Sequence, residues 1–224
     1  MKLAGVIFDF DGVIVDTEPL HYQAFVDILE PEGFSFSWED YREIYMGMDD
    51  REAFDTAFAR NGRVLDAERR SALIARKAKH FPALAAAADL APYPGVEALI
   101  REVAATLPLG LCSGALELDI LPMLDRFDLR DCFDVLVSAE QVSRSKPDPE
   151  SYCLALERLG LPNPGAVIAI EDTPAGIRSA NEAGCRVLAV SNSHPSTALS
   201  QADWVVAALS DTHIGALQNR LSSA

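Results

Sequence analysis

Residues 3–12, LAGVIFDFDG, decide the fold of this 224-residue chain. An unbroken apolar run rich in Val, Ile and Phe leads directly into two aspartates and a glycine. Such a run is typical of a strand in a parallel sheet that helices cover on both faces, because neither side of the strand then meets water. Ligands of an open parallel sheet gather at the carboxyl ends of its strands. We therefore expect Asp9 and Asp11 to lie in a ligand site.

Similar apolar runs recur along the chain, and each is predicted to form another strand of the same sheet. They span residues 109–113, 135–138, 167–170, 187–190 and 204–206. Between them, apolar residues repeat with helical spacing over residues 96–107, 116–127 and 152–159. Strands that alternate with helices of this length predict an α/β fold, a Rossmann-like parallel sheet with helices on both faces.

Residues 16–92 break this alternation. They carry helical patterns instead of buried strands, beginning with residues 20–29 and continuing through 38–45, 51–59 and 66–81. The Ala-Pro-Tyr-Pro-Gly turn at residues 91–95 ends the block. We therefore expect an α/β catalytic core of residues 1–15 and 93–224, with a small all-helical cap domain of residues 16–92 inserted after the first strand. Two connections between them would allow the cap to close over the core.

The composition excludes several classes of partner. The chain has 19 basic and 34 acidic residues, a net charge of −15, whereas nucleic acids and anionic membrane surfaces require clustered Lys and Arg. The first apolar run stops at Asp9, too early for a signal peptide, and no run reaches the ~18 residues of a membrane span. The four cysteines lack metal-binding spacing and are predicted to be free thiols. These features predict a soluble cytoplasmic protein, with no nucleic-acid or membrane partner and no prediction of oligomeric state.

Polar residues follow four of the predicted strands. They are Asp9 and Asp11 after the first strand, Ser113 and Gly114 after the second, Lys146 soon after the third, and Glu171 and Asp172 at the end of the fourth. An all-oxygen cluster of carboxylates suits Mg²⁺ together with a phosphate oxygen. A lysine and a hydroxyl at the same rim suit the remaining phosphoryl oxygens. Taken singly, a strand-end aspartate can simply form a turn, Ser113 can cap a helix, and Lys146 can be a surface lysine.

Together these residues resemble the four motifs of the haloacid dehalogenase superfamily. The matching segments are DFDGVIVDT at residues 9–17, Ser113-Gly114, Lys146-Pro147 and EDTPAG at residues 171–176. Their order and spacing match over essentially the whole chain. The helical insertion is similar to the cap of the phosphoglycolate phosphatase and β-phosphoglucomutase branch.

The resemblance implies a role for each motif residue. Asp9 would attack phosphorus and form an aspartyl-phosphate, and Asp11 would protonate the leaving oxygen and then activate water. Lys146 would balance the charge between Asp9 and the phosphoryl group. Ser113 and the N–H of Gly114 would bind phosphoryl oxygens. Mg²⁺ would be held by Asp9, Asp172, the backbone carbonyl of Asp11, and Glu171 directly or through water. An aspartate at position 11 indicates phosphoester cleavage rather than dehalogenation.

The residues of the expected cap include some that favour a mutase and some that disfavour it. Where the mutase branch usually carries Gly-x-Ser-Arg, this chain has GMDDR at residues 47–51, which disfavours a mutase. His21 and Lys77 resemble cap residues of mutases, although both also fit a solvated helix surface. We predict that His21, Arg51 and Lys77 contact the substrate, and that Asp49 and Asp50 begin a helix as its N-cap and first-turn acid.

The expected function is therefore a Mg²⁺-dependent phosphatase that acts on a small phosphorylated metabolite, either a sugar phosphate or a phosphorylated organic acid. One alternative is a hexose-phosphate mutase of the β-phosphoglucomutase kind, which returns the phosphoryl group to the sugar. A more distant alternative is a non-catalytic phospho-acceptor module, which also gathers aspartates around Mg²⁺ at a sheet end. The inserted helical block and Asp11 disfavour that last alternative.

Overall fold

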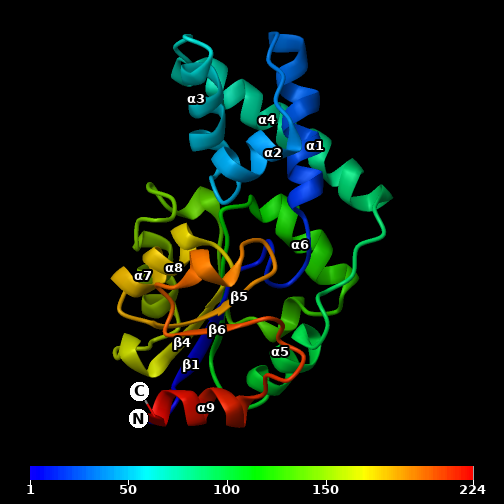
Figure 1. Ribbon diagram of the computed structural model, residues 1–224. Helices are drawn as coiled ribbons and strands as arrows, with labels where there is room; N and C mark the ends of the chain where they lie inside the picture. The colour runs from blue at the N-terminus through cyan, green and yellow to red at the C-terminus, as the bar shows by residue number, and fades with distance from the viewer. Residues whose placement is uncertain (224) are drawn as a thin grey trace.

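The computed structural model describes residues 1–223, so Ala224 at the end of the expected core range lies outside it (Figure 1). One sheet has six parallel strands in the order β3-β2-β1-β4-β5-β6. The strands are β1 (Gly5–Phe8), β2 (Leu109–Cys112), β3 (Val135–Val137), β4 (Val167–Glu171), β5 (Arg186–Val190) and β6 (Trp204–Val206). Each coincides with a run that the sequence predicted to be a strand, and the Rossmann-like fold class is confirmed.

The central strand β1 positions the candidate site. Phe8, its last residue, is level with Leu111 of β2 on one side and with Ile170 of β4 on the other. From β1 to β3, successive strands are added toward one edge of the sheet, whereas from β4 to β6 they are added toward the other. Ligands of such sheets bind where this order reverses, which here is between β1 and β4. The segments that follow β1, β2 and β4 therefore emerge together at one edge.

Helices cover both faces of the sheet because the β1 side chains alternate. Val6 and Phe8 belong to an apolar cluster with α5, α6 and α9, whereas Ile7 belongs to a second cluster with α7 and α8. The core helices are α5 (Val96–Ala104), α6 (Glu117–Arg126), α7 (Glu150–Arg158), α8 (Pro174–Glu182) and α9 (Ile214–Ser223). Short 3₁₀ turns are η1 (Glu30–Glu32), η3 (Arg130–Cys132), η4 (Ala139–Gln141), η5 (Pro164–Ala166) and η6 (Ser196–Leu199).

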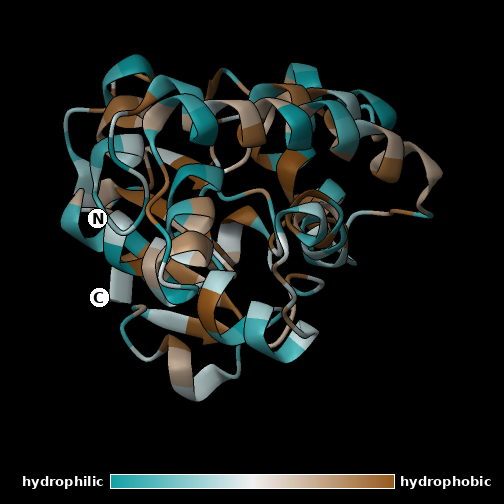
Figure 2. Ribbon diagram, turned by 90° about the horizontal axis from the view of Figure 1, so that it is seen from above, coloured by the Kyte–Doolittle hydropathy of each residue, from teal (hydrophilic) through white to brown (hydrophobic). Residues whose placement is uncertain are grey.

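Between β1 and β2 the chain is helical, and these helices lie above the sheet (Figure 1). They are α1 (Glu18–Leu29), α2 (Trp38–Asp40), the π-helical segment η2 (Tyr41–Tyr45), α3 (Asp50–Arg60) and α4 (Ala67–Ala87). Hydrophilic and hydrophobic residues alternate along the helices of the chain (Figure 2). Buried apolar side chains of the helices between β1 and β2, among them Phe25, Tyr41 and Phe54, form a cluster of their own. The buried members of this cluster run from Phe25 to Leu73, whereas Phe81 and Ala85 of α4 pack with the sheet core, so the cap bounds of 16–92 stay a prediction.

The two connections between cap and core lie side by side. Val15 pairs with Pro92 as an isolated bridge, and the Tyr93 N–H donates to the Ile14 carbonyl at 2.8 Å. Ile14 and Val15 are fully buried against the sheet. The path into the cap and the path out of it are therefore one paired hinge.

The two ends of the described chain meet on the side of the core away from the cap (Figure 1). The Leu3 N–H donates to Gln218 Oε1 of α9 at 2.8 Å, and the Gln218 side-chain amide donates to the Met1 carbonyl at 2.8 Å. All four cysteines are free thiols, as predicted. Among residues 1–223, no helix combines the length and the apolar character that a membrane crossing requires.

Candidate active site

Three carboxylates converge at the carboxyl end of the sheet. Asp9 follows β1, Glu171 ends β4, and Asp172 comes next; one oxygen of each lies within 4.8 Å of the others. All three side chains are buried. Gly12 allows this approach, since its φ is +74° and a Cβ there would overlap the Asp172 carboxylate. The cluster brings together the three carboxylates that the sequence proposed for a metal, whereas Asp11 was expected to contribute its backbone carbonyl, and its side chain lies outside the cluster.

Lys146 lies between two of these carboxylates. Its Nζ is 3.0 Å from Asp9 Oδ1 and 2.7 Å from Glu171 Oε1, and it donates to the Cys112 carbonyl at 3.0 Å. The Tyr152 hydroxyl donates to the same Glu171 oxygen at 2.7 Å. Burial alone would lower the pKa of Lys146, but the two carboxylates raise it above its ordinary value. Lys146 is therefore a fixed positive charge beside Asp9.

One lysine does not neutralise three buried carboxylates. Burial and neighbouring carboxylates raise the pKa of both Asp9 and Asp172 well above the usual range for aspartate. Asp172 Oδ2 accepts a hydrogen bond from the Ser193 hydroxyl, whereas its buried Oδ1 has no partner among residues 1–223. Crowded oxygens, surplus negative charge and an unpartnered oxygen fit a hard divalent cation such as Mg²⁺. Asp9 and Asp172 would provide the carboxylate ligands.

Asp11 points toward the cap rather than into this cluster. Its Oδ2 accepts a hydrogen bond from Ser113 Oγ at 3.1 Å, and its Oδ1 accepts one from the Thr17 hydroxyl and lies 3.3 Å from His21 Nε2. Burial raises the pKa of Asp11, but His21, Thr17 and Ser113 lower it more, so that it falls below its ordinary value. Such surroundings favour the ionised carboxylate, which can accept a proton.

The cap contributes a buried charged group opposite Asp9. Lys77 of α4 is 2% exposed, and its Nζ is 2.5 Å from Asp50 Oδ1 and 3.1 Å from His21 Nδ1. The His21 ring stacks on Phe81 with 4.3 Å between ring centroids. His21 and Lys77 therefore face the interior. The sequence alone had left a position on a solvated helix surface open for both.

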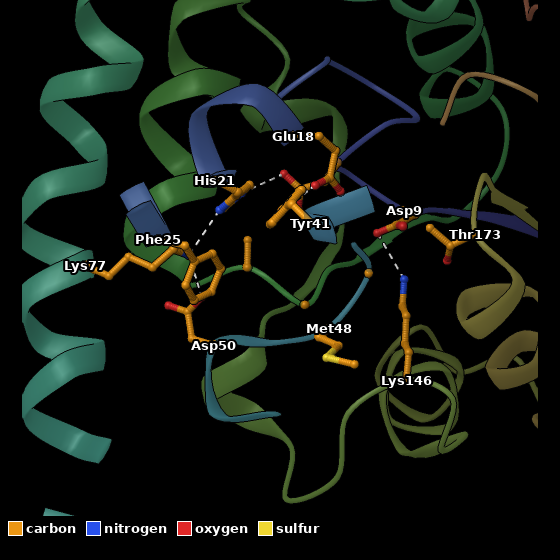
Figure 3. Close-up of a pocket in the computed structure, with 14 residues that line it drawn as sticks. Asp9, Glu18, His21, Phe25, Tyr41, Met48, Asp50, Lys77, Lys146 and Thr173 are labelled. Carbon is orange, nitrogen blue, oxygen red and sulfur yellow. Dashed lines mark hydrogen bonds and ion pairs between the residues drawn. The ribbon is translucent and has the colours of Figure 1, made fainter. Parts of the chain in front are cut away.

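A pocket between cap and core brings most of these residues together. It is lined by Asp9, Asp11, Glu18, His21, Phe25, Tyr41, Gly47, Met48, Asp50, Lys77, Gly114, Ala115, Lys146 and Thr173. Figure 3 shows Asp9 and Lys146 at one end and His21, Lys77 and Asp50 at the other. The pocket therefore brings the strand-end residues Asp9 and Lys146 and the cap residues His21, Lys77 and Asp50 to one shared space.

Arg51, which the sequence predicted to contact the substrate, is not among the residues that line this pocket. Its Nε is 2.7 Å from Asp49 Oδ2, and its other nitrogens donate to the Val142 carbonyl at 3.2 Å and to Ser145 Oγ at 3.1 Å. Asp49 is the N-cap of α3 and accepts from the Glu52 N–H at 2.8 Å, as predicted. Arg51 thus joins the start of α3 to the core loop that precedes Lys146.

Several residues of the site were missed in the sequence. Ser193 could have been found, because it follows the end of β5 as Asp9 follows β1. Tyr152 was assigned to the apolar face of a helix, where it does lie, and no pattern indicated its hydrogen bond to Glu171. Glu18 and Tyr41 meet through a 2.6 Å hydrogen bond between two cap segments, which only the fold brings together.

Comparisons with known proteins agree with this geometry. A family model described as "Haloacid dehalogenase-like hydrolase" matches residues 6–190. A phosphorylated carbohydrates phosphatase from Thermotoga maritima is 35% identical over 186 residues, which cover 81% of this chain and 82% of the relative.

Two solved structures are similar over nearly their full length. A mutant of CbbY from Rhodobacter sphaeroides, in complex with xylulose-1,5-bisphosphate, has a TM-score of 0.86 and 25% identity, covering 96% of this chain and 99% of that one. A β-phosphoglucomutase from Clostridium difficile has a TM-score of 0.89 and 25% identity, covering 100% and 98%.

Proposed function

The chain belongs to the haloacid dehalogenase-like hydrolase family and is a phosphatase, and on this premise we propose that it hydrolyses a small phosphorylated metabolite through an aspartyl-phosphate on Asp9, with Mg²⁺ as cofactor. A sugar phosphate is the favoured substrate class. The observation that carries the proposal is the placement of two aspartates on one pocket: Asp9 beside Lys146, and Asp11 beside Ser113. This arrangement offers a nucleophile and a separate proton carrier within reach of one phosphoryl group.

In the first half-reaction, an Asp9 carboxylate oxygen attacks phosphorus and the bond to the leaving oxygen breaks. Lys146 holds Asp9 and the phosphoryl oxygens in place, while Ser113 and the Gly114 N–H donate to those oxygens. Asp11, protonated beside the incoming dianion, gives its proton to the leaving oxygen. When bound by Asp9 and Asp172, Mg²⁺ supplies positive charge that stabilises the phosphoryl oxygens.

In the second half-reaction, Asp11 takes a proton from water, and the water oxygen attacks phosphorus. The bond to Asp9 breaks, which restores its carboxylate and yields inorganic phosphate. The contacts from His21, Thr17 and Ser113 that lower the pKa of Asp11 support this role, because they favour the ionised carboxylate that a base requires. Closure of the cap limits the entry of other nucleophiles.

A hexose-phosphate mutase remains the second candidate. The likeness to β-phosphoglucomutase and the buried His21–Lys77 pair favour it. The acidic residues at positions 49 and 50 disfavour it, because a mutase must also hold the second phosphate of a bisphosphate intermediate against the cap.

The proposal is tested by phosphate release from a panel of phosphorylated sugars, polyols and organic acids, each assayed with Mg²⁺ and with EDTA. We expect turnover with Mg²⁺, loss of turnover in EDTA, and inhibition by Ca²⁺, whose larger coordination shell misplaces Asp9. Asp9→Asn, which preserves shape, should retain less than about a tenth of the activity while its circular dichroism stays unchanged. Isomerised hexose phosphate in place of inorganic phosphate would indicate the mutase, and full turnover in EDTA would exclude the Mg²⁺ assignment.

A further inference from the structure

We propose that the cap side of the pocket selects phosphate esters whose leaving group is an uncharged polyol, and that it rejects a second phosphate or a carboxylate. Asp50 is the residue that determines this selection. The inference rests on the proposed phosphatase function and deepens it by naming the substrate class. It follows from the contacts that each polar group on the cap wall makes.

Lys77 is the cation that a second anionic group would be expected to meet, but other groups already occupy the three N–H donors of its ammonium. Asp50 Oδ1 lies 2.5 Å from Nζ and His21 Nδ1 lies 3.1 Å from it. The Phe25 ring occupies another side, with its centroid 4.4 Å from Nζ. An ammonium has three N–H donors, and two acceptors and an aromatic face use all three.

The other cationic groups near the pocket are also engaged. Lys146 is paired with Asp9 and Glu171 at the phosphoryl end. The His21 nitrogens face Lys77 on one side and Asp11 on the other. The Arg51 guanidinium contacts Asp49 and the core loop outside the pocket. None of these three offers a free positive charge to the leaving group.

The cap wall presents carboxylate oxygens instead. Asp50 Oδ2 is buried and has no partner among residues 1–223, although its Oδ1 is paired with Lys77. Glu18, which also lines the pocket, is buried, and its Oε2 accepts a hydrogen bond from the Tyr41 hydroxyl at 2.6 Å. A carboxylate oxygen accepts hydrogen bonds, so it suits a hydroxyl group and repels a phosphate or a carboxylate.

The test compares related esters of which one carries a second anionic group on its leaving group and the other does not. Suitable pairs are glucose 1-phosphate with glucose 1,6-bisphosphate, and glycerol 3-phosphate with 3-phosphoglycerate. With Mg²⁺ present, kcat/KM for phosphate release should be higher for the uncharged member of each pair by about tenfold or more, since like charges brought together are disfavoured. Equal rates within both pairs would overturn the inference and leave the phosphatase function intact.

Asp50→Asn tests the assigned residue. It keeps the shape of the side chain, removes one negative charge and frees Lys77 to meet an anion. The preference for glucose 1-phosphate over glucose 1,6-bisphosphate should fall by about tenfold relative to wild type. Asp55→Asn is the matched control, because it removes the same charge from α3 at a residue that pairs with Arg70 outside the pocket.

A second substitution identifies the cation that Asp50 masks. Adding Lys77→Met to Asp50→Asn should abolish the gain on the bisphosphate. An Asp50→Asn ratio equal to that of Asp55→Asn would show that Asp50 does not set the selection. Failure of the wild-type protein to release phosphate from any ester would instead contradict the phosphatase function itself.

Discussion

Asp9 and Asp11 are two residues apart, yet their surroundings push their pKa values in opposite directions. Burial and the neighbouring carboxylate of Glu171 raise the pKa of Asp9, whereas hydrogen bonds from His21, Thr17 and Ser113 lower that of Asp11. Such separation is how one site assigns different tasks to like groups. Asp9 needs a cation beside it to be ionised as a nucleophile, whereas Asp11 is held ionised as a base requires and would become a proton donor only when a phosphate dianion lies beside it.

Asp11→Asn tests the proton-transfer role. The alkoxide of an alkyl phosphate needs a proton as it leaves, whereas p-nitrophenolate is stable without one. The loss of phosphorylation rate should therefore be about 10²- to 10⁴-fold for an alkyl phosphate and much smaller for p-nitrophenyl phosphate. Rapid-quench measurements should also show a burst of nitrophenol and trapped phosphoprotein, because water is no longer activated.

The alternative is that Asp11 only shapes the turn and provides a backbone carbonyl to the metal. Asn retains that carbonyl, so the variant would then behave like wild type on both esters and show no burst. That result would show that Asp11 transfers no proton in the reaction.

At the scale of single residues, the sequence predicted the groups that follow strand ends and missed groups brought in by packing. Asp9, Asp11, Ser113, Lys146 and Asp172 were identified because polar residues directly after or near apolar strands share one sheet edge. The pairing of Lys77 with Asp50 joins two cap helices, and no local pattern encodes that contact.

At the scale of elements, the start of α3 is tied to the core. Asp49 accepts from Ser145, Arg51 donates to Ser145 and to Val142, and this loop leads directly into Lys146. The contact links the position of the cap to the segment that positions the charge beside Asp9.

Arg51→Ala should weaken this link and favour an open cap. We expect KM for the best substrate to rise by roughly tenfold with a smaller fall in kcat, because a loosely held cap binds the leaving group less well. Steady-state kinetics measure both values. Arg60→Ala, an exposed arginine at the other end of α3, is the matched control, and Arg51→Lys should recover part of the loss. Identical kinetics for Arg51→Ala and Arg60→Ala would contradict the link.

Elements with strong local patterns were predicted well. Continuous apolar runs marked every strand of the sheet, because strands buried on both faces tolerate few polar residues. The segment Tyr41–Tyr45 was expected as ordinary helix and is π-helical, with Tyr41 and Tyr45 buried in the apolar cluster of the cap. Helix α4 extends to Ala87 through Pro82, six residues beyond the predicted end at 81.

At the scale of the whole molecule, the carboxylate cluster couples metal binding to stability. The pKa values of Asp9 and Asp172 are raised in the folded protein. Above about pH 4 the folded state therefore holds protons that the unfolded chain has released, so stability falls as pH rises toward those raised values. A bound divalent cation would replace these protons, so the folded state would no longer lose stability as the pH rises.

Melting temperatures measured in EDTA should therefore be lower at about pH 7.5 than at about pH 5, and Mg²⁺ should raise the melting temperature more at the higher pH. Asp172→Asn should reduce both effects, since it removes one of the two raised carboxyl groups. A Mg²⁺ shift of equal size at both pH values would show that the cluster does not take up the cation in place of protons.

Met1 lies beside the last described turns of α9, where Gln218 and Ser222 both contact its carbonyl. Gln218 is bonded to Met1, and the helix continues only five residues further to Ser223, roughly 8 Å at 1.5 Å per residue. A flexible linker of about six residues spans such a gap. New ends placed at Gly62, in the exposed turn between α3 and α4, would interrupt no strand and no hinge segment. In terms of chain topology, the protein is thus suited to circular permutation, with the catalytic core encoded as one uninterrupted segment and the cap divided between its two ends.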